Sequence, residues 1–297
     1  MIKTCIFYIT LQCNDTCEFC HLWQNSDDQE IRGSVEQVKQ KLKELRIKGV
    51  KKLNLTGGEP LLCPDLPEIL RNARMLGFQT EMTTNGILYA EKEGEITGLL
   101  DQLYFSLDYP IASEHDRSRG VDCYNLVISA IKRSREKGDN PSINFTLTRD
   151  NVRFLPEMVE LSERLKVPVS LNPVYDYFGT QGFAPATIEH ILYYSRKRNV
   201  RVNRAALEFI KAGGNQTFLP RCRARDLTVT MLPDLSLVSP CFYNRSGQQG
   251  REPICSSCMR WPYMLPSFSV GIDKYFWLNL YSEWSDQLNL RLKSRSR

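Results

Sequence analysis

The amino-acid sequence predicts an α/β protein: an open, partial barrel of six strand–helix units, followed by a smaller cysteine-rich unit built from a β-hairpin and a helix. Two observations support this fold class. Over the first 200 residues, strand-like and helix-like segments alternate, which is the pattern of a parallel sheet covered by helices. After the Gly-Gly pair at 213–214 the alternation stops, and clustered cysteines follow. We therefore expect a core domain at residues 1–205 and a second domain at residues 206–297.

Local signals justify each element of the barrel in turn. The short apolar run at 5–11 predicts the first strand. Ser34, with Gln37 three residues on, predicts a capped helix that stops at Gly49. Asp65 with Glu68 predicts a second capped helix. The remaining strands are expected at residues 52–56, 79–83, 103–107, 143–148 and 167–171, and the remaining helices near residue 96 and at 124–137, 155–165 and 187–198.

The last third of the chain carries different signals. Residues 227–232 and 235–239 flank Pro233-Asp234 and predict a hairpin, with Leu235 where a glycine would suit the turn. An aromatic-rich helix is expected at 275–292. Six strand–helix units are too few to close an eight-stranded barrel. An open barrel of this kind would still have its active site at the C-terminal ends of the strands, where the loops converge.

The composition is that of a globular protein. The chain has 297 residues, of which 42% are hydrophobic, so it can bury a large core. It has neither a signal peptide nor a membrane-spanning run, which predicts a cytoplasmic protein without a membrane partner. Its ten cysteines then indicate metal binding. Residues 201–297 contain 14 Lys and Arg against 7 Asp and Glu, but no nucleic-acid-binding motif accompanies this charge, so we expect no nucleic-acid partner.

Three cysteines, Cys13, Cys17 and Cys20, lie on the loop that follows the first predicted strand. Three thiolates can bind three irons of a [4Fe–4S] cube, which leaves the fourth iron open to a substrate or cofactor. The alternative is a zinc site with His21 as the fourth ligand. Adjacent Cys20 and His21 would be awkward partners on one tetrahedral ion, so the cluster is favoured.

A second motif, Gly57-Gly-Glu-Pro60, follows the second predicted strand. Together with Cys-x3-Cys-x2-Cys after the first strand, it makes the chain resemble the radical S-adenosylmethionine (radical SAM) enzymes. The resemblance covers about residues 1–200. It implies a partial (β/α)6 barrel, a [4Fe–4S] cluster on the three cysteines and SAM bound at the open iron. It also implies an external electron donor such as a flavodoxin or a ferredoxin.

The resemblance further implies a set of SAM contacts. Gly57 and Gly58 lack side chains and are expected to let the backbone approach the bound methionine, while Glu59 accepts from its ammonium group. Segments 83–86 and 106–108 resemble family segments that contact the ribose and carboxylate of SAM, although both also suit turns. An aromatic side chain is expected beside the adenine. The expected contacts are Phe19, Gly57, Gly58, Glu59, Pro60, Thr84, Asn85, Ser106 and Asp108.

A second cysteine set follows the barrel: Cys222, Cys241, Cys255 and Cys258. Four thiolates around a hairpin can bind zinc or a second iron–sulfur cluster. By resemblance, this region is similar to the twitch domain, a shortened SPASM domain that holds an auxiliary cluster in some radical SAM enzymes. We therefore expect one auxiliary [4Fe–4S] cluster, fully ligated by protein and suited to electron transfer.

Other polar and thiol side chains have two interpretations each. Cys5 and Cys63 are expected to be buried apolar residues, while Cys123, near the barrel mouth, is either another such residue or a hydrogen-atom donor. His115, with its charged neighbours, either binds a polar substrate or lies in a solvated turn, and the turn is favoured. The segment 175–177, Tyr-Asp-Tyr, offers further substrate contacts.

These features predict that a reduced cluster splits SAM and that the resulting 5′-deoxyadenosyl radical removes a hydrogen atom from an unactivated C–H bond. The main expectation is net oxidative modification of a peptide, sugar or cofactor precursor, and the alternative is epimerisation or rearrangement. The substrate is thus a small molecule or a peptide. Two other classes remain: a non-catalytic iron–sulfur electron carrier and a nucleic-acid-binding protein with a C-terminal zinc ribbon.

The two ends of the sequence add two expectations. The first strand begins close to Met1, so a peptide substrate is expected to need a separate recognition partner. The final Ser-Arg-Ser-Arg lacks the Gly-Gly tail of the related molybdenum-cofactor cyclase, which argues against that activity.

Overall fold

The computed structural model describes residues 2–20, 22–25, 31–174, 183–214, 222–238 and 261–294. Its framework is one curved sheet with the strand order β7-β6-β5-β4-β3-β2-β1-β8-β9. Every neighbouring pair is parallel except β8 and β9, so the sheet is predominantly parallel. The strands are β1 (Thr4–Tyr8), β2 (Lys52–Thr56), β3 (Gln79–Thr84), β4 (Gln102–Ser106), β5 (Pro141–Leu147), β6 (Val169–Pro173), β7 (Val200–Arg201), β8 (Thr228–Met231) and β9 (Leu237–Val238).

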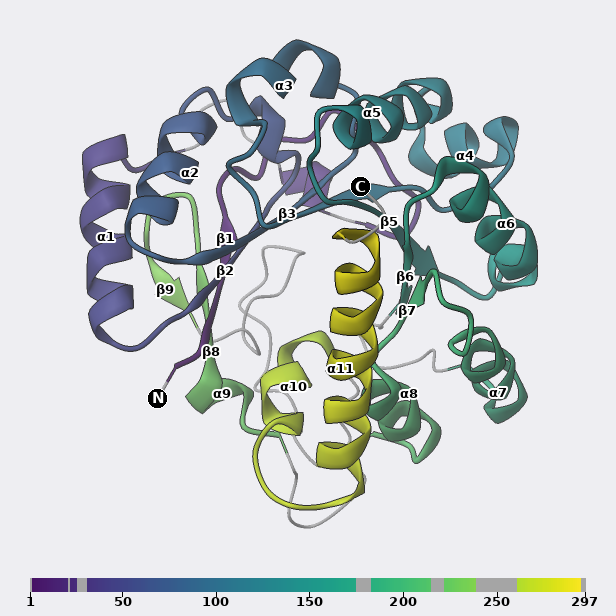
Figure 1. The fold of residues 1–297 in the computed structure, drawn as a ribbon. Helices are drawn as coiled ribbons and strands as arrows, with labels where there is room; N and C mark the ends of the chain where they lie inside the picture. The colour runs from purple at the N-terminus through teal and green to yellow at the C-terminus, as the bar shows by residue number, and fades with distance from the viewer. Residues whose placement is uncertain are drawn as a thin grey trace.

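Helices cover the outside of this sheet, which curves into an open barrel (Figure 1). The predicted α/β class and the six strand–helix units are confirmed, with strand ends shifted by a few residues. The helices are α1 (Val35–Ile47), α2 (Leu66–Met75), α3 (Tyr89–Ile96), α4 (Ala112–Arg119), α5 (Tyr124–Glu136), α6 (Leu155–Leu165), α7 (Pro185–Tyr194), α8 (Arg204–Lys211), α9 (Ala224–Leu227), α10 (Trp261–Phe268) and α11 (Lys274–Ser294), with short 3-10 turns η1 (Leu22–Asn25), η2 (Pro60–Leu62) and η3 (Val152–Phe154).

Two of the predicted helix starts have different outcomes. At α1 the capping box is present: Ser34 Oγ accepts from the Gln37 amide, and the Gln37 side chain accepts from the Ser34 amide at 2.8 Å. At α2 the predicted cap is wrong, because the Asp65 side chain makes no capping hydrogen bond. Asp65 has helical backbone angles, whereas a capping side chain needs the extended conformation that Ser34 adopts.

The barrel has an apolar outer face and a polar inner face. On β4, Leu103 and Phe105 belong to the core between sheet and helices, whereas the alternate residues Gln102, Tyr104 and Ser106 line the interior cavity. On β2, Leu53 and Leu55 likewise belong to the core, while the alternate positions line the cavity, because successive side chains of a strand point to opposite faces. Closed eight-stranded barrels fill their interior with branched apolar side chains. Here many inner positions carry polar side chains, and a cavity is left between them.

The predicted hairpin is confirmed, but it extends the barrel sheet. β8 pairs in parallel with β1, with Thr4 opposite Thr228, and β9 pairs antiparallel with β8. Leu235 in the connecting turn has a φ of 66°, the left-handed conformation that usually selects glycine. α8 packs against α10 and α11, as Figure 1 shows near the barrel opening. Cys241, Cys255 and Cys258 lie outside the described residues, so the cysteine-rich unit and the boundary after residue 205 stay predictions.

Among the described residues, no helix combines the length and the apolar character needed to cross a lipid bilayer.

Candidate active site

A cavity of about 840 Å³ runs from the loop after β1 into the interior of the barrel. The side chains of Cys13, Cys17 and Cys20 all contribute to its wall. Polar residues from the inner faces of the strands line the rest, together with parts of α10 and α11. The three cysteines therefore face a space that continues to the far end of the strands.

The loop that carries the cysteines packs tightly against the Gly-Gly pair after β2. The Gly58 amide donates to Thr10 O and the Glu59 amide donates to Gln12 O, both at 2.8 Å. A Cβ atom on Gly57 would lie 2.1 Å from Thr10 O, and one on Gly58 would lie 1.9 Å from Gln12 O. The group closest to the Cβ positions of both glycines is the backbone of the β1 loop, whereas the expected contact of these glycines with the methionine moiety of SAM stays a prediction.

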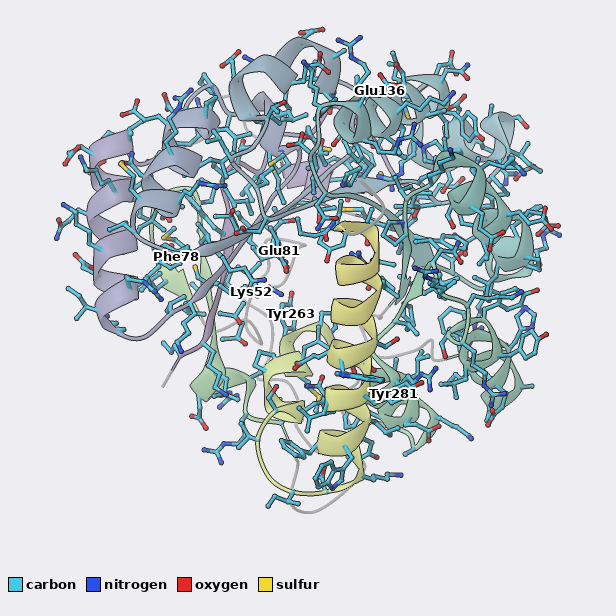
Figure 2. All side chains as sticks on the ribbon, viewed as in Figure 1. Lys52, Phe78, Glu81, Glu136, Tyr263 and Tyr281 are labelled. Carbon is cyan, nitrogen blue, oxygen red and sulfur yellow. The ribbon has the colours of Figure 1, made fainter. Side chains whose placement is uncertain are left out.

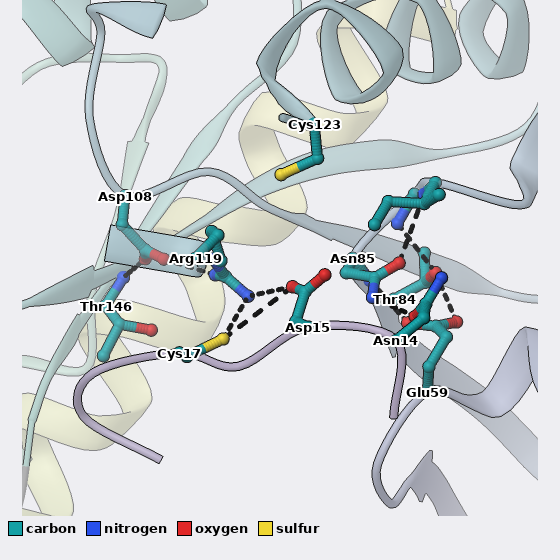
Figure 3. A network of polar contacts seen from close by, with 12 residues as sticks. Asn14, Asp15, Cys17, Glu59, Thr84, Asn85, Asp108, Arg119, Cys123 and Thr146 are labelled. Carbon is teal, nitrogen blue, oxygen red and sulfur yellow. Dashed lines mark hydrogen bonds and ion pairs between the residues drawn. The ribbon is translucent and has the colours of Figure 1, made fainter. Parts of the chain in front are cut away.

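Glu59 connects three strand ends beneath the cysteine loop (Figure 3). Its carboxylate accepts from Thr84 Oγ1 and the Asn85 amide, each at 2.7 Å, and from the Leu61 amide at 2.9 Å. The Asn85 side chain in turn donates to Asn14 Oδ1 at 2.7 Å. Asn14 is part of the cysteine loop. Burial raises the pKa of the Glu59 carboxyl to about 7, against the three hydrogen bonds that lower it. Both carboxylate oxygens are therefore already engaged by protein donors.

The C-terminal end of α4 holds the opposite side of the cysteine loop. The Thr16 amide donates to Arg119 O at 2.9 Å, and the Glu18 amide donates to Ser118 O at 3.0 Å. Gly120 follows with a φ of 70°, and a Cβ there would lie 2.0 Å from Thr16 Oγ1. α4 is missing from the sequence prediction, which expected a solvated turn in this region.

Arg119 is the main functional residue that the sequence analysis missed. Its guanidinium is buried and forms ion pairs with Asp15 and Asp108 (Figure 3). Nη1 also lies 3.5 Å from Cys17 Sγ, and the guanidinium carbon lies 5.6 Å from the centre of the Phe19 ring. The acidic partners raise the Arg119 pKa well above its usual range. A permanent positive charge therefore touches one of the three cysteines.

Asp108 does not line the cavity, and its role as a SAM contact stays a prediction. Its carboxylate is fully buried, pairs with Arg119 and accepts from the Thr146 amide at 2.9 Å. Its own amide donates to His115 Nδ1 at 3.2 Å. His115 is fully buried, which contradicts the expected solvated turn, and burial lowers its pKa to about 3. Asp108 and His115 thus position Arg119 and the end of α4.

The remaining predicted residues differ in whether they line the cavity. Cys5, Cys63 and Cys123 are buried, as expected for the first two. Cys123 does not line the cavity, which leaves a hydrogen-atom donor role without geometric support. Of the other expected SAM contacts, Pro60 also lies off the cavity wall, while the following seven lie on it: Phe19, Gly57, Gly58, Glu59, Thr84, Asn85 and Ser106. His21 and residues 175–177 lie outside the described part of the chain.

The family model that matches this sequence is the radical SAM superfamily, over residues 7–160, which is more than half of the chain. The chain belongs to the radical SAM superfamily. The family implies a [4Fe–4S] cluster and SAM. The matched residues include both the cysteine loop and the segment after β2.

Curated relatives of this radical SAM superfamily member are named probable GTP 3′,8-cyclase. The protein from Metallosphaera sedula is 34% identical over 174 residues, which is 56% of this chain and 55% of that protein. The protein from Sulfolobus acidocaldarius is 26% identical over 242 residues, 74% of this chain and 76% of that protein. The chain spans about half the length of most of the curated relatives it matches.

Two solved structures share the fold. SuiB from Streptococcus suis, also solved with its precursor peptide SuiA, has a TM-score of 0.68 at 18% identity and covers 85% of this chain and 63% of its own. The protein anSMEcpe with bound AdoMet has a TM-score of 0.61 at 16% identity and covers 94% of this chain and 88% of its own. At these identities the similarity concerns the fold alone.

The residues of the β1 loop fit the cluster that the family implies. The three thiols face one cavity, and burial raises the pKa of Cys13 to about 12 and also raises that of Cys17. Without iron the Cys13 and Cys17 thiols keep their protons, so iron binding must release these protons. In the described ranges, no three His, Cys, Asp or Glu side chains converge on one metal ion. A cube does not require such convergence, because it takes one thiolate per iron.

Proposed function

We propose that Cys13, Cys17 and Cys20 bind a [4Fe–4S] cluster at the mouth of the barrel and that SAM binds between this cluster and the ends of β2, β3 and β4. A polar substrate would then occupy the barrel interior. The observation that carries this proposal is the single cavity, which joins all three cysteines to the polar inner faces of the strands. A radical formed at the cysteine loop would meet a substrate bound in that interior without crossing bulk water.

When bound, the reduced cluster supplies one electron that cleaves SAM to methionine and a 5′-deoxyadenosyl radical, which then takes a hydrogen atom from a substrate carbon. The protein positions these groups. Glu59 and Asn85 fix the cysteine loop relative to β3, and Arg119 fixes it relative to α4. We propose that SAM contacts the cavity-lining residues of the predicted set other than the Glu59 side chain, and that Glu59 and Asp108 act by positioning the residues around them.

We propose a rearrangement as the outcome, in place of the net oxidation that the sequence analysis favoured. The curated relatives are named for a cyclase reaction on GTP, and an intramolecular ring closure is closer to the rearrangement alternative. We expected no cyclase activity because the final residues lack a Gly-Gly tail, but the last residues of this sequence do not decide the activity. We propose a small polar molecule as the substrate class, with a flavodoxin or ferredoxin as the electron donor.

We also propose that Cys222, Cys241, Cys255 and Cys258 bind an auxiliary cluster in a twitch-like unit at residues 206–297. The proposal is supported by their spacing and by the hairpin that follows Cys222. Such a unit would adjoin the barrel opening, because the hairpin pairs with β1 and α10 packs on α9. Two clusters predict about eight irons per chain.

The experiment is anaerobic reconstitution, followed by iron and zinc analysis and by measurement of 5′-deoxyadenosine after reduction with SAM. We expect about eight irons per chain and 5′-deoxyadenosine formation. Cys17→Ala should abolish SAM cleavage, whereas Cys63→Ala, a buried thiol off the cavity wall, should retain it. Iron with one zinc per chain would refute the auxiliary cluster. Persistent cleavage in Cys17→Ala would refute the ligand assignment.

A further inference from the structure

The far end of the barrel interior contains a buried arginine. Arg201 is on β7, opposite Ser170 of β6, and its side chain lines the cavity. Its Nη1 donates to Gln102 Oε1 at 3.0 Å and to Ser142 Oγ at 3.1 Å. Gln102 is the first residue of β4, whereas Ser106, at the end of the same strand, lies toward the cysteine loop. Arg201 therefore lies at the end of the cavity opposite the proposed cluster.

Among the described residues, Arg201 differs from Lys52 and Arg119, two other cations that line the cavity, in having no acidic partner. Lys52 pairs with Glu81 at 2.7 Å, and both point into the barrel (Figure 2). Arg119 pairs with two aspartates. Arg201 is only 9% exposed, and within the described residues its contacts are two neutral oxygens, while its buried Nε has no hydrogen-bond partner.

A buried cation without a counter-ion is unfavourable, because the protein does not replace the solvation that the charge loses. An anionic ligand group would supply both the missing charge and acceptors for the unused N–H groups. The planar guanidinium suits carboxylate and phosphate groups in particular, since it can donate two parallel hydrogen bonds to either. The polar walls around it, with Asn144 and Asn172 hydrogen-bonded to each other, are suited to a hydrophilic molecule.

We infer that Arg201 binds an anionic group of the substrate, a carboxylate or a phosphate, at the end of the barrel interior opposite the cysteine loop. This inference rests on the proposed function, because it assumes that the substrate occupies the interior. Gln102, next to Arg201, and Ser106, near the proposed SAM site, are four residues apart on β4, which corresponds to about 13 Å along the strand. The substrate would thus extend roughly that distance from its anionic group to the carbon near SAM, which is the length of a nucleotide-sized molecule.

The test measures anion binding directly. The reconstituted enzyme with SAM is titrated with inorganic phosphate and, separately, with acetate at constant ionic strength, and the apparent affinity is taken from the concentration dependence of the melting temperature. The variants are Arg201→Gln, Arg201→Lys and Arg198→Gln, the last an exposed arginine just before β7. Phosphate and acetate distinguish the two possible anionic groups.

We expect at least one anion to bind the wild-type enzyme and Arg201→Gln to weaken that binding about tenfold or more. Arg201→Lys should lose less anion affinity than Arg201→Gln, because lysine keeps the positive charge but lacks the planar guanidinium with its paired donors. Arg198→Gln should bind the anion as tightly as the wild type does. The inference is overturned if neither anion binds, or if Arg201→Gln binds as tightly as wild type. If Arg201→Gln does not fold, wild-type-like binding by Arg201→Lys overturns it equally. Wild-type 5′-deoxyadenosine formation, measured in parallel, reports on the proposed function independently.

Discussion

Gly58→Ala is the substitution for which the structure gives the clearest magnitude. The new Cβ would lie 1.9 Å from Gln12 O and 2.6 Å from Leu11 O, both backbone atoms that cannot rotate away. The cysteine loop must therefore move by about 1 Å or more to restore ordinary contact. Such a shift disrupts the hydrogen bonds from the Gly58 and Glu59 amides to Thr10 and Gln12. Two backbone hydrogen bonds contribute about 1–3 kcal/mol together.

Gly94→Ala is the matched control, because it makes the same substitution in open space. Gly94 lies within α3, and a Cβ there meets no atom within 4 Å. Alanine favours helix over glycine by about 0.5–1 kcal/mol. The two variants should therefore change the free energy of unfolding in opposite directions.

The assay combines chemical denaturation of the iron-free protein with iron content after anaerobic reconstitution. We expect Gly58→Ala to lose about 1–3 kcal/mol of stability and to bind substantially less iron at the β1 loop. Gly94→Ala should be slightly stabilised and should bind iron normally. If Gly58→Ala matches the wild type in both measurements, the packing of the Gly-Gly pair against the cysteine loop is not what requires glycine.

Three further predictions test the surroundings of the site. Arg119→Met leaves Asp15 and Asp108 buried without a counter-ion and should cost about 3–5 kcal/mol of unfolding free energy; Arg133→Met removes an exposed partner of Glu93 and should have little effect, and equal losses would contradict the role given to Arg119. Burial raises the Glu59 pKa from 4.5 to about 7, so the unfolded chain ionises first and the iron-free wild type should lose stability as pH rises from 4.5 to 7. Denaturation at several pH values should show a flatter profile for Glu59→Gln, and identical slopes would refute the shift. Cys123→Ala should retain product formation, because Cys123 lies off the cavity wall; loss of product with intact SAM cleavage would restore its role as a hydrogen-atom donor.

The sequence predicted the barrel well because its signals are local. The strands alternate polar and apolar residues, and α1 carries a capping box that forms as expected. α4 was missed because its buried face consists of His115, Ser118 and Arg119, so it has no apolar stripe to recognise. Its helical character comes from packing on the cysteine loop.

The sequence identified the cysteines and the Gly-Gly-Glu-Pro segment, but it could not assign the roles of the surrounding residues. Arg119 meets Asp15 across 104 positions of sequence, and no local pattern reports such a contact. The same reason applies to Asp108, which follows a strand at the correct end of the barrel but whose partners are distant in sequence. Its orientation depends on Arg119 and Thr146, whose positions only the folded chain fixes.

The central claim is that the cluster on Cys13, Cys17 and Cys20 has an open iron that binds SAM. Electron paramagnetic resonance of the reduced, reconstituted enzyme tests it most directly, with spectra recorded before and after SAM is added. We predict a [4Fe–4S]⁺ signal whose shape changes on adding SAM, and the loss of that SAM-responsive signal in Cys17→Ala. A cluster signal that SAM leaves unchanged in the wild type, or a SAM-responsive signal that survives in Cys17→Ala, would contradict it.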